Sequence, residues 1–336
     1  MTYRVSLNGW IILDKPIDLG STTAVSAVKR ILREAGEPKT KVGHGGTLDP
    51  LASGVLPIAL GEATKLCGRL LNATKGYDFT ISFGAETDTL DLEGAVIATS
   101  DVRPILDEIE TALPRFRGEI EQTPPAYSAL KIDGKAAYAR ARAGEDVELK
   151  PRGVTIHSLS IRNAPGDNKV TLSATVSKGT YIRSLARDIA HALGTVGHVS
   201  YLRRTRAGPF ALESAISLDF LEEAAKARRL TETVMPLTAA LDDIPALPVT
   251  PDQARLLRHG QKLVGFPAKP GLGLATREGT PVGLGEASAD GLTVVRGFDL
   301  ETNGVLHDVD YRRAQGSSEQ GTCPVQGRHR FAGSPG

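Results

Sequence analysis

The sequence predicts an α+β fold, with a mixed, largely antiparallel β-sheet flanked by helices and a small β-rich domain at the C-terminal end. Three observations support this class. Apolar runs with strand-like alternation follow one another through short turns more often than through crossover helices. Helical spacing is confined to a few separate segments. The chain has 336 residues, enough for one large core and a smaller companion domain.

The first strand and helix are expected near the N-terminus. Residues 9–16 form a short apolar run that ends at a proline, which indicates a buried strand, and residues 22–32 have helical spacing. Residues 43–46 make a glycine-rich turn. Residues 48–60 alternate small and aliphatic side chains with two prolines, so we expect a rigid loop of apolar backbone there.

The middle of the chain supplies further strands and helices. Strand alternation is present in residues 77–84, 154–161 and 170–176. Helices are expected at about residues 105–113 and 181–193. These segments predict helices combined with a mainly antiparallel sheet.

A domain boundary is expected where the composition changes, near residues 242–248. One domain would then cover residues 1–245 and a second, rich in glycine and short strands, residues 246–313. Residues 314–336 contain too little apolar surface to offset the entropy of ordering, so we expect this tail to be disordered.

Composition argues against membrane, secreted and metal-binding classes. No segment approaches the ~18 uncharged apolar residues of a membrane span, and the N-terminus lacks the layout of a signal peptide, so a cytoplasmic location is expected. The two cysteines, Cys67 and Cys323, lie too far apart in sequence to suggest a disulfide framework or a zinc knuckle. We expect no metal site.

Positive charge is concentrated in the middle of the chain, although the net charge is only +1. Residues 121–206 hold fourteen Lys or Arg against seven Asp or Glu, whereas both flanking parts are slightly acidic. Such a stretch suits a phosphate-contacting face, but it occurs as often on an ordinary solvated surface.

One glycine-framed loop, residues 41–57, carries a single carboxylate, Asp49, among apolar neighbours. Such an ion has to be paired or used, and the glycines allow a planar ligand to approach the backbone. The loop has neither the Gly-Lys-Ser/Thr end of a P-loop nor the strand-to-helix placement of a dinucleotide fingerprint. Taken alone, the pattern more often means that Asp49 caps a turn and that His44 is a structural histidine.

This loop resembles the hallmark of the TruB family of tRNA pseudouridine synthases, Gly-His-x-Gly-x-Leu-Asp-Pro-Leu-Ala-x-Gly, which stands here at residues 43–54. The resemblance covers roughly residues 9–210, with further motifs in register at residues 61–65, 75–77, 87–91, 125–131, 177–183 and 201–204. Two positions depart from the family. Residues 15–18 read Lys-Pro-Ile-Asp, with the family glycine displaced to Gly20, and Gly45 stands where threonine is common.

The resemblance implies a cofactor-free enzyme that converts uridine to pseudouridine in the T-loop of tRNA, at position 55. The target base is flipped out, the bond from N1 to C1′ is broken, and the freed uracil is turned and rejoined through C5. Asp49 would be the nucleophile or base. It could attack C1′, attack C6 or remove a sugar proton, and the residues leave these three routes open.

The resemblance also assigns the other site residues. Arg183 would pair with Asp49, and Tyr77 would stack on the uracil and take part in proton transfer at C5. Taken alone, Tyr77 would more often be a core residue of a strand and Arg183 a surface residue. Substrate-binding roles fall on His44, Asp91, Tyr181, Leu202 and Lys131. His44 would support the flipped nucleotide, and Leu202 would pack against its base.

Two further regions acquire a meaning from the resemblance. Residues 124–152 lie where the family carries an insertion that grips RNA, and residues 246–313 resemble its small PUA-like module. The cations expected to contact phosphates are Lys131, Lys135, Arg140, Arg142, Lys150 and Arg152. The T-arm of tRNA is then the expected partner, with a monomeric chain and no protein partner required.

Two alternatives stay open. The chain could be an RNA-binding folding helper for tRNA that performs no turnover, or a synthase that acts on another structured RNA. Intact Asp49, Tyr77 and Arg183 favour catalysis, because a carboxylate facing RNA lowers the affinity of a protein that only binds. The absence of long basic tails favours a stand-alone tRNA enzyme.

Overall fold

The structure is a computed structural model that describes residues 7–128, 130–132, 135–143, 149–166 and 168–300. Most of its strands join one large sheet: β1 (Gly9–Lys15), β2 (Val42–His44), β3 (Ala52–Leu60), β4 (Lys75–Phe83), β7 (Gly118–Gln122), β10 (Arg152–Gly166), β11 (Lys169–Val176), β12 (Gly197–Ala207), β13 (Phe210–Ala211) and β14 (Met235–Pro236). Two small ribbons stand apart from it: β5 (Ala85–Thr87) with β6 (Val96–Thr99), and β8 (Lys131–Ile132) with β9 (Lys135–Ala136).

The large sheet has ten strands among the described residues, in the order β14-β1-β3-β12-β4-β11-β10-β7, with β2 beside β3 and β13 beside β12. Neighbouring strands run antiparallel, except β3 and β12, which are parallel. This mixed and mostly antiparallel sheet confirms the predicted fold class.

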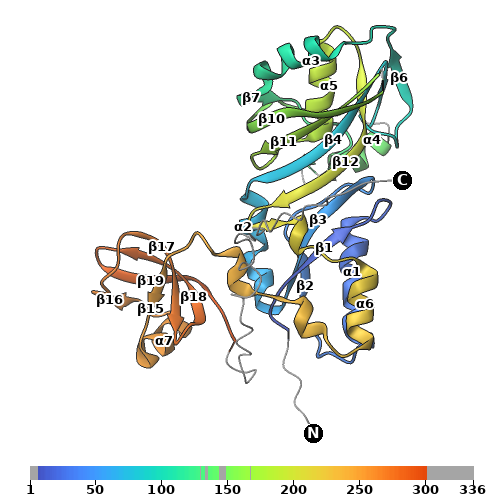
Figure 1. Cartoon of the computed structure of the whole chain (residues 1–336). Helices are drawn as coiled ribbons and strands as arrows, with labels where there is room; N and C mark the ends of the chain where they lie inside the picture. The colour runs from blue at the N-terminus through green and yellow to red at the C-terminus, as the bar shows by residue number, and fades with distance from the viewer. Residues whose placement is uncertain (1–6, 129, 133–134, 144–148, 167, 301–336) are drawn as a thin grey trace, which may run out of the picture. The chain divides into compact units, whose positions relative to one another are not determined.

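Helices cover the sheet at both ends (Figure 1). The α-helices are α1 (Ser21–Glu34), α2 (Cys67–Asn72), α3 (Leu106–Ala112), α4 (Ala137–Arg142), α5 (Ile182–Ala192), α6 (Leu218–Lys226) and α7 (Pro251–Arg258). Short 3₁₀ turns are η1 (Gly61–Leu66), η2 (Leu113–Phe116), η3 (Leu212–Ser214), η4 (Leu230–Thr233) and η5 (Leu237–Ala240). None of the helices in the described ranges is long and apolar enough to cross a membrane.

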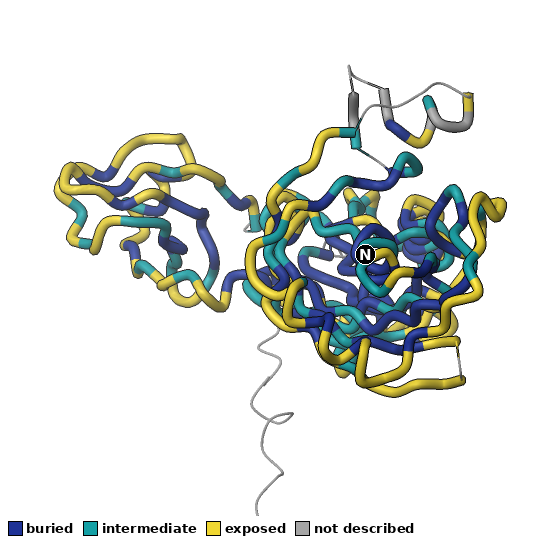
Figure 2. Tube along the Cα trace, turned by 90° about the horizontal axis from the view of Figure 1, so that it is seen from above, coloured by how far each residue is buried: buried dark blue, intermediate teal, exposed yellow. Residues whose placement is uncertain are grey.

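The helices at the two ends of the sheet bury separate apolar clusters. The buried residues of α5 recur three or four positions apart, and they pack with α3 against β4, β10 and β11. At the other end α1 and α6 pack against β1 and β3. Tyr77 and Leu202 contact both clusters, so they lie where the two cores meet. Figure 2 shows the buried stretches of the chain inside the molecule, with exposed stretches mostly at its periphery.

The prediction of a rigid loop at residues 48–60 is wrong for most of that range, because residues 52–60 form the fully buried strand β3. Pro57 is tolerated there because it stands where the pairing with β2 ends. Its carbonyl still accepts a bond from the amide of Gly45 at 2.8 Å, and its missing N–H would have faced the same side. The predicted helices and the other strands are present, and β10 extends beyond the expected end to Gly166.

The C-terminal part forms its own five-stranded sheet, in the order β15-β17-β18-β19-β16. Its strands are β15 (Ala246–Pro248), β16 (Leu263–Val264), β17 (Gly271–Arg277), β18 (Thr280–Ser288) and β19 (Gly291–Gly297). The helix α7 covers it through buried Ala254 and Leu257. The expected domain end at residue 313 and the expected disordered tail at 314–336 lie outside the described residues.

Candidate active site

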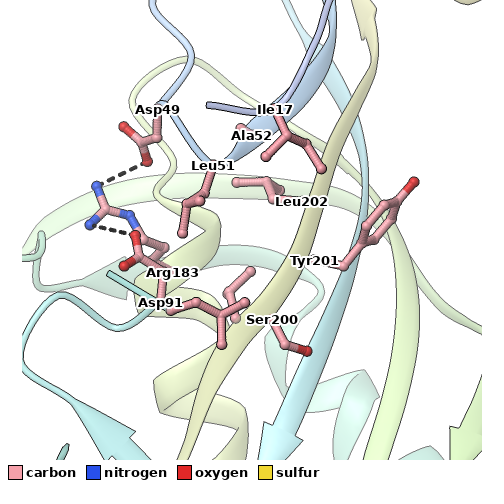
Figure 3. Close-up of a pocket in the computed structure, with 11 residues that line it drawn as sticks. Ile17, Asp49, Leu51, Ala52, Asp91, Arg183, Ser200, Tyr201 and Leu202 are labelled. Carbon is pink, nitrogen blue, oxygen red and sulfur yellow. Dashed lines mark ion pairs between the residues drawn. The ribbon is translucent and has the colours of Figure 1, made fainter. Parts of the chain in front are cut away.

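An ion pair joins the loop between β2 and β3 to the start of α5. The Oδ2 atom of Asp49 lies 3.0 Å from Nη2 of Arg183, the second residue of that helix (Figure 3). The two side chains differ in exposure, with 40% of the Asp49 side chain and 7% of the Arg183 side chain open to solvent. The carboxylate can therefore meet a ligand while its cation stays fixed in the interior.

Backbone carbonyls and a second carboxylate hold Arg183 in place. Its Nη1 donates to the carbonyl of Thr89 at 2.8 Å and its Nη2 to the carbonyl of Tyr127 at 2.9 Å. The buried Asp91 lies 3.5 Å from Nη1, and its other oxygen accepts bonds from the Thr89 hydroxyl and the amide of Glu93. The guanidinium is thus oriented before any ligand arrives.

The ion pair borders a small and mostly apolar pocket. Its lining includes Leu51, Ala52 and Leu202, with the partly exposed Ile17 and Leu92 among the remaining residues. In Figure 3 the apolar side chains of Ile17, Leu51 and Leu202 lie to one side of the pair, and the carboxylate of Asp91 lies beside Arg183. An apolar wall beside carboxylates suits a flat ligand that makes few fixed hydrogen bonds.

The edge of the pocket on β12 contains a β-bulge. Val199 pairs with Ile81 and Tyr201 with Thr80, so that Ser200 is the extra residue on β12. Bulges are frequent beside active sites because they change the direction of neighbouring side chains. The lining reaches Tyr201, whose ring lies at the far end of the pocket from Asp49 (Figure 3).

The Asp49 loop is fastened to the N-terminal segment. The Ser21 hydroxyl both donates to the carbonyl and accepts from the amide of Leu48, each at 2.8 Å. The fully buried Lys15 ammonium donates to the carbonyls of Pro16, Leu19 and Pro50, at 2.8, 2.6 and 3.1 Å. Burial is the main cause that lowers the pKa of Lys15 to about 8, and the charge of Asp49 opposes it.

Comparison with known proteins decides the family. The TruB family pseudouridylate synthase N-terminal domain matches residues 29–182, and the tRNA pseudouridylate synthase B C-terminal domain matches residues 183–242. The tRNA pseudouridine synthase B of Zymomonas mobilis is 61% identical over 295 residues, which cover 88% of this chain and 97% of that protein. The chain belongs to the TruB family.

Other relatives and solved structures agree with this assignment. The tRNA pseudouridine synthase B of Novosphingobium aromaticivorans is 59% identical over 299 residues, covering 88% of this chain and 98% of the relative. Among solved structures, an H/ACA ribonucleoprotein bound to a substrate RNA containing 2′-deoxyuridine matches with a TM-score of 0.67 and 26% identity, over 88% of this chain and 87% of that chain. A Cbf5–Nop10–Gar1 complex matches with a TM-score of 0.65 and 29% identity, over 86% and 84%.

The structure brings together four of the site residues expected from the TruB resemblance. Asp49, Asp91, Arg183 and Leu202 all line the pocket. Tyr77 is half-buried on β4 and contacts both apolar clusters, but it is not part of this lining. Its assignment as the base-stacking tyrosine stays a prediction.

The remaining expected residues are not part of the pocket lining. His44 ends β2, and its Nδ1 accepts a bond from the amide of Gly46 at 3.3 Å, while burial and then the charge of Arg204 lower its pKa. Tyr181 immediately precedes α5, and the guanidinium of Arg152 lies 4.9 Å from the centre of its ring. Lys131 belongs to β8, but its side chain lies outside the described residues.

The two departures from the TruB pattern have visible consequences. Asp18 takes a φ of 66°, a conformation that glycine adopts freely, and its amide donates to the carbonyl of Pro50 at 2.9 Å. A Cβ at Gly45 would lie 2.6 Å from the Cδ1 atom of Leu70, so glycine fits beside that buried leucine. Asp18 and Gly45 therefore both fit the backbone and packing around the loop that carries Asp49.

Lys15 and Arg204 lie within motifs of the TruB resemblance, but the sequence predicted no role for either residue. Both are fully buried, and their side chains donate hydrogen bonds to backbone carbonyls. The available signal was a charged residue at a position that strand alternation assigns to the interior.

Proposed function

We propose that this TruB family member isomerises uridine to pseudouridine in tRNA, and that its target is the T-loop uridine at position 55. The single observation that carries the proposal is the Asp49–Arg183 pair at the edge of an apolar pocket. The names of its close relatives support tRNA as the substrate.

The proposed reaction is balanced without a co-reactant. The N1–C1′ bond breaks and a C5–C1′ bond forms, while the hydrogen on C5 is lost and N1 takes up a proton. No electrons are exchanged, so the reaction itself requires no cofactor. Asp49 acts at C1′, at C6 or on a sugar proton, and Arg183 orients this carboxylate.

The uridine has to leave the RNA stack before Asp49 can reach it. Leu51, Ala52 and Leu202 then offer an apolar surface on which the freed uracil turns. We assign the proton transfer at C5 to Tyr77 and support of the flipped nucleotide to His44, with Asp91, Tyr181 and Lys131 as further contacts. The protein would act in the cytoplasm as a monomer on the tRNA T-arm, without a protein partner.

The experiment measures tritium release from an unmodified tRNA transcript that carries C5-labelled uridine. The parent protein is compared with Asp49→Asn and with Asp14→Asn, which alters a carboxylate paired with Arg203 outside the pocket. A second transcript replaces the T-loop uridine by cytidine.

Release that needs both Asp49 and the T-loop uridine, and that survives Asp14→Asn, is the expected result. Release from the cytidine transcript at the parent rate would place the target elsewhere in the RNA. No release by the parent protein, combined with tight tRNA binding, would overturn the proposal in favour of an RNA-folding helper.

A further inference from the structure

Arg204 is a buried cation without a carboxylate partner among the ion pairs of the described residues. Only 1% of it is exposed, although burying an unpaired charge is costly. Its guanidinium instead donates hydrogen bonds to three backbone carbonyls. Nε donates to the carbonyl of Val55 at 2.7 Å, Nη1 to that of Thr47 at 3.1 Å and Nη2 to that of Gly46 at 3.1 Å.

Two of these three carbonyls belong to the loop that carries Asp49. Gly46 and Thr47 lie between the end of β2 and the carboxylate, while Val55 belongs to β3 just after the loop. One side chain therefore joins the loop to the strand that follows it. Gly46 has a φ of 145°, so its conformation is one that a side-chain-bearing residue would not hold easily.

The main chain of Arg204 is fixed as tightly as its side chain. It pairs with Gly54 of β3 on one side and with Tyr77 of β4 on the other. A Cβ at Gly54 would lie 2.2 Å from the carbonyl oxygen of Arg204, which shows how closely the two strands approach. The guanidinium is thus carried by a residue whose main chain is paired with a strand on each side.

The preceding residue, Arg203, provides an internal contrast. Strand alternation points it to the other face, where its Nη2 lies 2.7 Å from the carboxylate of Asp14 and 27% of its side chain is exposed. Arg203 makes a partly exposed ion pair, whereas the hydrogen bonds of the Arg204 guanidinium go to main-chain carbonyls around the Asp49 loop.

We propose that Arg204 is a positioning residue for the reaction, which holds the Asp49 loop in its working shape through the carbonyls of Gly46, Thr47 and Val55. The inference rests on the proposed function. A planar guanidinium presents donors from three nitrogens in fixed directions, and here each nitrogen reaches the carbonyl of a different residue, whereas the ammonium of lysine would have to serve all of them from one nitrogen. Shape, and not charge alone, is the property that this site requires.

The test compares Arg204→Lys, Arg204→Gln and Arg204→Met with the matched control Arg203→Met. Single-turnover rate, kcat, KM and the Kd for tRNA are measured for each, together with hydrogen exchange of the amides in residues 44–51. For Arg204→Lys and Arg204→Met we expect kcat to fall by about 100-fold, because a displacement of about 1 Å has that cost, while the Kd changes by less than about 3-fold. Exchange in the loop should accelerate in both, and Arg203→Met should resemble the parent.

Several results would overturn the proposal. Full kcat in Arg204→Lys would mean that only the positive charge matters. A loss confined to the Kd, removed by raising the salt concentration, would make Arg204 a phosphate contact. An equal fall of kcat in Arg203→Met would show that the fall in the Arg204 variants does not come from the Asp49 loop.

Two safeguards keep these outcomes separate. If Arg204→Met fails to fold, the lysine and glutamine variants carry the comparison. Hydrogen exchange can be measured without turnover. Unchanged exchange in residues 44–51 of the Arg204 variants would therefore contradict the inference by itself. Absence of tritium release by the parent protein would contradict only the proposed function.

Discussion

Adjacent residues on β1 and β12 face opposite sides of the large sheet and show two ways in which this protein uses charge. On one face Asp14 pairs with Arg203, and Arg162 pairs with Asp78, beside a polar groove. On the other face Lys15 and Arg204 are fully buried and bind backbone carbonyls around the Asp49 loop. A partly exposed pair such as Asp14–Arg203 adds ~0–1 kcal/mol, whereas buried cations bonded to carbonyls fix the path of the chain.

The largest difference between the two faces should appear when an arginine is removed from each. Arg183→Met leaves Asp49 without its partner and removes the donor to the carbonyls of Thr89 and Tyr127. We expect the single-turnover rate to fall by about 1,000-fold, comparable with the loss of a preorganised electrostatic contact. Arg162→Met, on the other face, should keep the rate within about 2-fold.

Rapid quenching of a single turnover on unmodified tRNA measures both rates. The Kd for tRNA, measured in parallel, separates lost chemistry from lost binding. If Arg183→Met has the parent single-turnover rate when saturated with tRNA, the two faces of the sheet do not differ in their importance for catalysis.

A smaller and pH-dependent difference should come from Lys15. Its pKa in the folded protein is lowered from 10.5 to about 8, so between these pH values the unfolded chain binds more protons than the folded one. The free energy of unfolding should therefore rise with pH across this window, by at most about 1.4 kcal/mol per pH unit from this group. Below the window Lys15 is charged in both states and adds no slope.

Lys15→Met should flatten this rise, although the variant will be less stable because three carbonyls lose their donor. Lys75, whose pKa is also lowered to about 8, is present in both proteins and cancels in the comparison. Urea unfolding at a series of pH values measures the slopes. Identical slopes for the parent and the variant would show that the Lys15 ammonium is not held in the low-polarity setting that the structure gives it.

The sequence predicted the fold better than the contacts that shape the site. Alternation and helical spacing located most strands and helices because those patterns are local. The Asp49–Arg183 pair was expected only from motifs in register with a family, since its two residues lie far apart in the chain. The strand β3 was missed because Pro57 looked incompatible with a buried strand, and only its position at the end of the β2 pairing explains it.

The contacts of Lys15 and Arg204 could not be predicted from local sequence patterns for a related reason. Arg204 meets the carbonyl of Val55 across 149 positions of sequence, and Lys15 meets that of Pro50 across 35. Every residue has a carbonyl, so no residue type marks the acceptor. Such contacts become visible only when the strands are placed side by side.

The smallest effect is expected for the Asp14–Arg203 pair itself. Both side chains are partly exposed, 35% and 27%, so water replaces much of the interaction when one partner is removed. A double-mutant cycle with Asp14→Asn and Arg203→Met should give a coupling energy below about 1 kcal/mol from urea unfolding. Turnover should stay within about 2-fold of the parent in all three variants, because neither side chain lines the pocket. A coupling of several kcal/mol, or a turnover that depends on this pair, would mean that the polar face supports the Asp49 site as strongly as the buried cations do.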